Sequence, residues 1–123
     1  MERTILIVDD NLVNLRMAEL ILVNAGYVVK RATSGLQCLG ILGEETVDLI
    51  LLDIAMPIVD GFQTMKSIQE HDVWKKIPVF FLTADGARAS VEEAVSLGAV
   101  DYIKKPFVPE QLLARVKHAL DKY

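Results

Sequence analysis

The sequence predicts an α/β protein with a doubly wound, five-stranded parallel sheet. Short apolar runs alternate with amphipathic stretches along the 123 residues, which is the pattern of the βα units that build a parallel sheet. The third run, residues 47–52, is apolar apart from one aspartate, as expected of a strand that helices cover on both faces. We therefore expect five such units, (βα)5, in a single domain over residues 1–123.

The expected strands are the apolar runs themselves. They cover residues 5–8, 27–32, 47–52, 79–82 and 99–103. Runs of this length are typical of strands and short for helices. Right-handed crossovers with helices on both faces make the flavodoxin-like strand order 2-1-3-4-5 the economical arrangement.

The expected helices follow from apolar residues at helical spacing and from residues that favour helix ends. The first covers residues 12–25, before Gly26, which suits a left-handed C-cap. The second runs from the N-cap residue Ser34 to Gly43, and the fourth covers residues 87–97. The apolar positions of the first, second, third and fifth helices are Leu15, Ala18, Ile21, Leu22 and Ala25; Leu36, Leu39 and Leu42; Phe62, Met65 and Ile68; and Leu112, Leu113, Val116 and Leu120.

Composition and charge argue against several classes of protein. The net charge is −4, whereas a protein that binds nucleic acid directly favours a basic face. No apolar stretch approaches the roughly 20 residues of a membrane-spanning helix, and the first residues lack the pattern of a signal peptide. We therefore expect a cytoplasmic protein that binds neither nucleic acid nor membranes directly.

Cysteine and histidine offer little chemistry in this chain. Cys38 is the only cysteine, which excludes an internal disulfide or a cysteine-based zinc site, and we expect it to be buried and inert. His71 and His118 lie in charged helical stretches, where a solvated position is expected.

Polar residues follow four of the expected strands at the point where each strand ends. They are Asp9 and Asp10 after the first strand, Asp53 after the third, Thr83 after the fourth, and Lys104 and Lys105 after the fifth. Ligands of open parallel sheets bind beyond the carboxyl ends of the strands, so we expect these side chains to converge. Any one of them is also ordinary turn chemistry, but the complete set is hard to explain by turns.

Three carboxylates at one point repel one another, and a divalent cation is the simplest relief. Mg²⁺ binds through one or two carboxylates together with waters and a phosphate. We expect Asp10 and Asp53 as direct ligands with the backbone carbonyl of Ala55, and Asp9 acting through a bound water. Mn²⁺ can substitute for this ion.

With the metal bound, Asp53 is the expected nucleophile of a phosphoryl transfer that forms an aspartyl phosphate. The charge on the transferred oxygens calls for an ammonium and a hydroxyl or backbone amide, which Lys105, Thr83 and the following Ala84 supply. Pro106 fixes the turn after the lysine. The isomer of its peptide bond is left open, with trans as the general default.

These motifs resemble the receiver domains of two-component response regulators. The resemblance covers nearly the whole chain and rests on residues 5–10, 53–61, 82–84 and 98–107. It implies that Asp53 is the phosphoacceptor, that Asp9 and Asp10 serve Mg²⁺, and that Thr83 and Lys105 are the switch hydroxyl and the phosphate-binding lysine. Such a protein is a regulator that catalyses at most its own phosphorylation and dephosphorylation.

The resemblance also implies partners. A sensor histidine kinase or a histidine phosphotransfer protein is the expected phosphodonor, docking on the first helix near Asn11, Asn14 and Leu15. Tyr102 stands where the family has its rotating aromatic residue, so that phosphorylation switches the surface of the fourth helix, fifth strand and fifth helix. A homodimer through that surface is possible.

Two further features bear on the same surface and site. Asp101 is expected to pair with Arg115, either within one chain or across a dimer. Ala55 and Asp85 occupy positions that tune phosphate lifetime in the family, in a direction that the sequence leaves open.

Three other functions compete with this interpretation. A haloacid-dehalogenase-like phosphatase needs a second acid two residues after its nucleophile, where this chain has Ala55. A flavodoxin-like flavin binder needs a phosphate loop after the first strand, where Asp9 and Asp10 would repel a phosphate. A receiver-like interaction module that works without phosphorylation stays open as the alternative function, although such modules normally lack part of the acidic set.

Overall fold

Five parallel strands form one sheet in the order β2-β1-β3-β4-β5. The computed structural model describes residues 2–56, 58, 60–83 and 88–122. The strands are β1 (Thr4–Val8), β2 (Val28–Ala32), β3 (Leu49–Asp53), β4 (Val79–Thr83) and β5 (Asp101–Lys104). The predicted fold class and strand order are confirmed, and strand boundaries differ from expectation by one or two residues.

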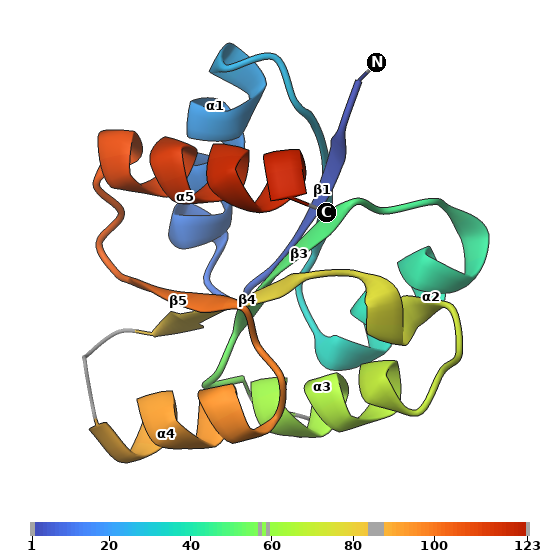
Figure 1. The fold of residues 1–123 in the computed structure, drawn as a ribbon. Coiled ribbons are helices and arrows are strands. Elements are labelled where there is room, and N and C mark those ends of the chain that lie inside the picture. Colours follow the sequence, from blue (N-terminus) through green and yellow to red (C-terminus); the bar gives the residue numbers. More distant parts are fainter. Residues whose placement is uncertain (1, 57, 59, 84–87, 123) are drawn as a thin grey trace.

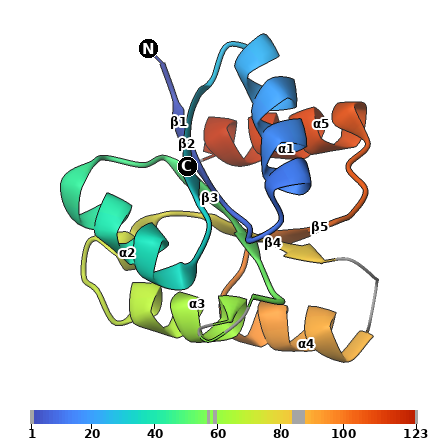
Figure 2. The same ribbon diagram turned by 180° about the vertical axis from the view of Figure 1, so that it is seen from behind.

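Helices cover both faces of the sheet (Figures 1 and 2). The helices are α1 (Leu12–Asn24), α2 (Gly35–Glu44), α3 (Gly61–Gln69), α4 (Arg88–Ser96) and α5 (Pro109–Lys122), with a short 3-10 turn η1 (Trp74–Lys76) that the sequence did not predict. Helices α1 and α5 lie on one face, and α2, α3 and α4 lie on the other. None of the described helices is long and apolar enough to cross a membrane.

The alternation of side chains along the strands divides the core into two layers. Ile5 and Ile7 of β1 pack with residues of α1 and α5, whereas Leu6 and Val8 pack with residues of α2 and α3. Successive residues of a strand point to opposite faces of the sheet, so a fully apolar strand serves both layers. Because helices cover both faces of the sheet, we look for reactive polar side chains at the ends of the strands.

Two of the expected inward positions are corrected by the structure. Leu36 is 68% exposed, because α2 buries the face that carries Gly35, Cys38 and Leu42. A residue next to an inward one on a helix is turned by about 100°, which places Leu36 outside. Ala25 is exposed because it is the C-cap of α1 and lies beyond the helix.

The helices α1 and α2 end close to the glycines at which the sequence predicted that they would stop. Gly26 has φ +97° just after the cap of α1, as predicted. The second helix passes Gly43 by one residue.

Gly61 allows the third helix to start against the backbone of Asp53. Its N–H donates to the carbonyl oxygen of Ile54 over 2.8 Å. A Cβ atom at this position would overlap the carbonyl oxygen of Asp53 and lie 2.8 Å from Cα of Ile54. Glycine is therefore required here by close approach rather than by turn conformation.

Replacing this glycine tests the contact. Gly61→Ala should lower the free energy of unfolding by about 1–3 kcal/mol, because the methyl group forces the backbone of β3 and α3 apart. Gly40→Ala on α2 is the matched control: a Cβ there meets nothing within 4 Å, so it should stabilise by about 0.5–1 kcal/mol. Urea denaturation measures both. Equal effects of the two substitutions would contradict the close approach.

Candidate phosphorylation site

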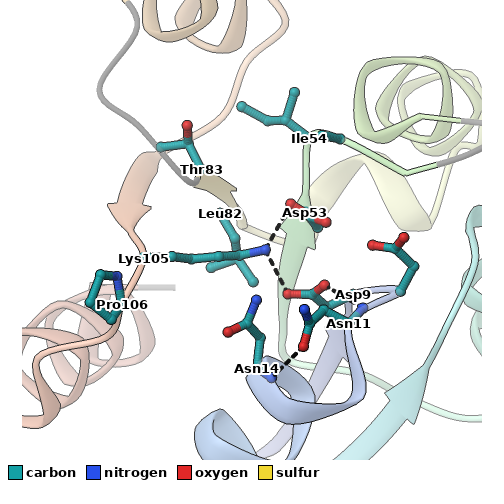
Figure 3. Close-up of a pocket in the computed structure, with 11 residues that line it drawn as sticks. Asp9, Asn11, Asn14, Asp53, Ile54, Leu82, Thr83, Lys105 and Pro106 are labelled. Carbon is teal, nitrogen blue, oxygen red and sulfur yellow. Dashed lines mark hydrogen bonds and ion pairs between the residues drawn. The ribbon is translucent and has the colours of Figure 1, made fainter.

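The carboxyl ends of β1, β3, β4 and β5 surround a pocket of about 580 Å³ (Figure 3). Its lining consists of Asp9, Asp10, Asn11, Asn14, Asp53, Ile54, Ala55, Leu82, Thr83, Lys105 and Pro106. Asp9, Asp10, Asp53, Thr83 and Lys105 of the predicted cluster therefore lie in one place, whereas the expectation for Lys104 is wrong, since it is exposed and borders a different cavity. The parallel topology brings them together, since β1, β3 and β4 are neighbours and β5 flanks β4.

Tyr102, which is also expected at the site, is not part of this lining. Tyr102 is half-buried and borders a separate cavity of about 150 Å³ between β5 and α5. Ala84 lies outside the described residues, as does Asp85.

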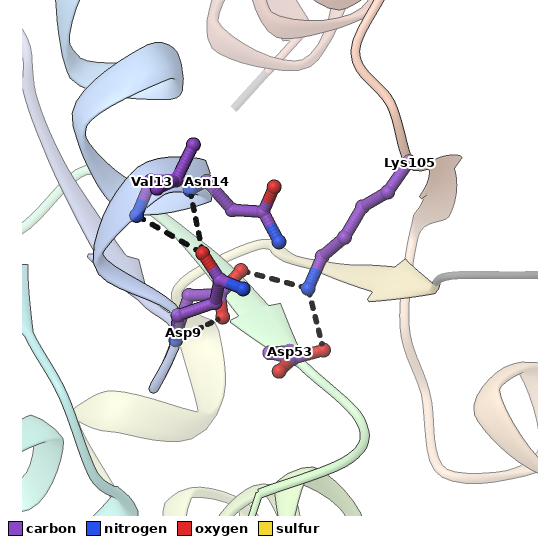
Figure 4. A network of polar contacts seen from close by, with 6 residues as sticks. Asp9, Val13, Asn14, Asp53 and Lys105 are labelled. Atoms are coloured by element: carbon purple, nitrogen blue, oxygen red, sulfur yellow. Dashed lines mark hydrogen bonds and ion pairs between the residues drawn. The ribbon is translucent and has the colours of Figure 1, made fainter.

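Lys105 joins the first and third strands electrostatically. Its Nζ lies 2.7 Å from Oδ2 of Asp9 and 3.0 Å from Oδ1 of Asp53 (Figure 4). The lysine side chain is only 10% exposed. Its main-chain N–H donates to the carbonyl oxygen of Thr83 over 2.8 Å, which ties the lysine to the end of β4. The peptide bond between Lys105 and Pro106 is cis, in contrast to the general default.

Burial and charge shift the protonation of this group of side chains. Burial raises the pKa of Asp53 to about 6; the hydrogen bond from Lys105 opposes this, and the charges of Asp9 and Asp10 add to it. For Lys105, burial acts to lower the pKa, but hydrogen bonds and charge attraction to Asp9 and Asp53 together outweigh it, so its pKa is raised. The site thus carries more negative charge than its one ammonium balances.

The carboxylates fit a hard divalent cation. One oxygen from each of Asp9, Asp10 and Asp53 can be chosen so that all lie within 4.8 Å of one another. Oδ2 of Asp9 is buried, and among the described residues it has the lysine ion pair but no regular hydrogen bond. Ala55 borders the same pocket and is exposed. Carboxylate oxygens gathered at one point are the ligands that Mg²⁺ prefers.

The N-cap of α1 positions the acidic segment after β1. Oδ1 of Asn11 accepts from the N–H groups of Val13 and Asn14 at the start of α1, over 3.0 and 3.1 Å. The N–H of Asn11 itself donates to Oδ1 of Asp9 over 2.9 Å. The start of the helix and the orientation of the Asp9 carboxylate are therefore set by the same residue.

The segment after β3 ends in a capping box at the start of α3, which was not predicted from the sequence. Oδ1 of Asp60 accepts from the N–H of Gln63, and Oε1 of Gln63 accepts from the N–H of Asp60, each over 2.9 Å. An N-cap residue followed three positions later by glutamine is a readable sequence signal. This cap, with Gly61, holds α3 against the end of β3.

The cysteine and the histidines lie away from the pocket. Cys38 is buried in the core, and burial raises the pKa of its thiol to about 12, as expected for an inert residue. His71 is exposed and stacks on Trp74 with ring centroids 3.8 Å apart. His118 is exposed on α5.

Comparison with known proteins decides the family. The family model described as the response regulator receiver domain matches residues 5–117 of this chain. The chain belongs to the family of response regulator receiver domains. Receiver domains of response regulators are signalling proteins with a phosphoacceptor role rather than classical enzymes.

Individual relatives agree with this assignment. The regulatory protein VanRc of Enterococcus gallinarum is 35% identical over 123 residues, which are all of this chain and 52% of the relative. A putative response regulator from Chloroflexus aurantiacus superposes with a TM-score of 0.94 at 37% identity, covering 98% of this chain and 99% of the other. The receiver domain spans about half the length of the curated relatives that it matches.

One similar structure bears on the metal. The receiver domain of a sensor histidine kinase from Pseudomonas aeruginosa, with a magnesium ion coordinated in its active-site cleft, has a TM-score of 0.90 and 28% identity, covering 98% of this chain and 99% of its own. The cluster of Asp9, Asp10 and Asp53 fits a receiver Mg²⁺ site of this kind.

The raised pKa of Asp53 predicts how stability depends on pH without metal. The folded state holds the Asp53 proton up to about pH 6, whereas the unfolded chain releases it near 3.8. The folded state thus binds more protons in this interval, so the free energy of unfolding should fall as the pH rises from about 4 to 6. Asp53→Asn should remove this fall and stabilise the protein at pH 7.5 by about 1–2 kcal/mol, a value reduced for solvent screening.

Urea denaturation in a chelating buffer across this pH range measures the effect. Asp121→Asn, at an exposed position of α5, is the control and should keep the wild-type pH dependence. Identical profiles for wild type and D53N would show that burial of Asp53 has no energetic consequence.

Proposed function

We propose that Asp53 accepts a phosphoryl group from a phosphohistidine of a sensor histidine kinase or phosphotransfer protein, with Mg²⁺ bound beside it. The observation that supports this most is the buried contact of Lys105 with Asp53 and Asp9, over 3.0 and 2.7 Å. An ammonium held at the acceptor carboxylate is ready to bind a phosphoryl oxygen after transfer. This proposal assigns the pocket a covalent modification rather than a diffusible substrate.

The transfer is a displacement at phosphorus. An oxygen of Asp53 attacks, the bond between phosphorus and the donor imidazole nitrogen breaks, and that nitrogen keeps the electron pair and takes a proton from solvent. Asp10, Asp53 and the carbonyl oxygen of Ala55 would hold Mg²⁺ directly, with Asp9 acting through a water. When bound, the ion neutralises charge on the phosphoryl oxygens. Mn²⁺ would serve the same ligands.

Phosphorylation has a direct route to the end of β5. The added anion attracts the hydroxyl of Thr83, and Thr83 is bonded through its carbonyl to the N–H of Lys105. Thr83 and Lys104 are also paired in the register of β4 and β5. A shift of Thr83 would therefore reach Tyr102, two residues before Lys104, and alter the surface of α4, β5 and α5. Ala84 is proposed to contribute to phosphoryl binding through its position after Thr83.

The same surface could support a homodimer. Arg115 donates to Oδ1 of Asp101 over 2.8 Å within one chain, so this pair satisfies itself in the monomer. A dimer through α4, β5 and α5 would be built around this pair or would exchange it between subunits.

The outer face of α1 suits a protein phosphodonor. Five of its side chains are large, apolar and exposed: Leu12, Val13, Met17, Leu20 and Val23. A helix that is apolar on both faces is normally covered, and this one begins at the pocket, where a donor must bring its histidine. The expectation that Leu15 belongs to this docking surface is wrong, since Leu15 is 3% exposed and packs in the core.

Phosphorylation can be tested with a small acyl phosphate. Incubation with the donor and Mg²⁺ should increase the intact mass by one phosphoryl group, and Asp53→Asn should abolish the increase. Lys105→Met should lower the rate about 100-fold, the effect of losing one charge-stabilising donor. Absence of any adduct with Mg²⁺ or Mn²⁺ would reject the proposal and favour a receiver-like interaction module that works without phosphate.

The docking surface can be tested separately. Leu20→Glu should weaken binding of a protein phosphodonor by about 10–100-fold, the loss expected of an apolar contact residue, and leave phosphorylation by the acyl phosphate unchanged. Leu36→Glu is the matched control on α2, since Leu36 is also exposed (68%, against 53% for Leu20) but α2 lies on the opposite face of the sheet. Calorimetric titration measures the affinities. Equal effects of L20E and L36E would contradict docking on α1.

A further inference from the structure

Polar and apolar residues of α1 are arranged unusually around the phosphorylation pocket. Five of its exposed positions are apolar, as listed above for the docking face, beside the polar Arg16 and Asn24, whereas Asn14 is half-buried and polar. A surface helix normally has the opposite pattern. Asn14 lines the phosphorylation pocket, so the polar residue has been placed toward the site rather than toward solvent.

The side-chain carboxamide of Asn14 is available at this pocket. It extends toward the side chain of Lys105 (Figure 4) and belongs to the pocket lining drawn in Figure 3. The cap of α1 uses only its main-chain N–H, which donates to Oδ1 of Asn11 over 3.1 Å. Within the described part of the chain, the Asn14 side chain has no hydrogen bond.

The neighbouring lining residues already have other roles. Lys105 contacts Asp9 and Asp53, and Oδ1 of Asn11 accepts two helix N–H groups. Ala55 has no polar side chain with which to hold a water. A neutral carboxamide both donates and accepts, so Asn14 can bind a water and a phosphoryl oxygen without adding charge.

We infer that Asn14 is a positioning residue for hydrolysis of the Asp53 phosphate, an inference that rests on the proposed function. Its carboxamide orients a water on the side of phosphorus opposite Asp53. The water oxygen bonds to phosphorus, the bond between phosphorus and the Asp53 oxygen breaks, and the electron pair returns to the carboxylate. Both protons of the water leave with the product, dihydrogen phosphate. Asn14 thereby sets how long the phosphorylated state lasts.

Measurement of phosphate lifetime tests this role. The chain is phosphorylated with a small acyl phosphate, the donor is removed, and decay of the phosphorylated mass is followed in saturating Mg²⁺. Asn14→Leu should slow the decay about 5–10-fold, the equivalent of losing one hydrogen bond in the transition state. Asn14→Gln should recover part of this rate, because it keeps the carboxamide.

Controls separate positioning from structure. Asn24→Leu makes the same replacement at the exposed last residue of α1, outside the pocket, and should decay like wild type. The thermal midpoint and the Mg²⁺ affinity of N14L should match those of N24L, because the cap bond is a main-chain bond.

Three results would overturn the inference. Decay of N14L at the rate of N24L would exclude a role for Asn14 while leaving phosphorylation of Asp53 intact. Decay of N14Q as slow as that of N14L would assign the effect to packing instead of the carboxamide. A wild-type chain that takes no phosphoryl group would reject both this inference and the proposed function.

Discussion

The buried ion pair of Lys105 with Asp9 and Asp53 is the interaction on which the site depends. It joins residues from three strand ends across 2.7 and 3.0 Å in a place where charges are costly to bury. One ammonium offsets two buried carboxylates, and exposed Asp10 adds further negative charge. Burial raises the pKa of Asp53, and the charges of Asp9 and Asp10 add to this shift. The excess negative charge makes the pocket receptive to a divalent cation.

The scaffold supports this group of buried charges in two ways: helices cover the apolar faces of the sheet, and capping residues fix the starts of α1 and α3 beside the pocket. Both faces of the sheet are sealed by helices, so the charged groups have no competing partners in the core. Asn11 starts α1 and orients Asp9, and the Asp60–Gln63 box with Gly61 fixes α3 against Asp53. The folded scaffold thus holds carboxylates together although they repel one another, and a bound divalent cation would relieve this repulsion.

Two surfaces extend from this site in different directions. The apolar outer face of α1 begins at the pocket and suits a partner that brings a phosphoryl group. The network of Arg115, Asp101 and Tyr102 links β5 to α5, because Arg115 donates to both Asp101 and the carbonyl oxygen of Tyr102. In the proposed function, input would use α1 and output the β5 edge of the sheet, with coupling through the ends of β4 and β5.

The amino-acid sequence by itself determined the fold class, the strand order and the identity of the clustered residues, because apolar period and strand-end chemistry are local properties. Tertiary structure decided which face of α2 is covered, so that Leu36 is exposed although its spacing matches the other apolar positions of that helix. It also decided that Asp101 pairs with Arg115 within the chain, that Gly61 meets the backbone of Asp53, and that Asn14 faces the pocket. These features depend on how separate helices and strands pack against one another, which no local pattern encodes.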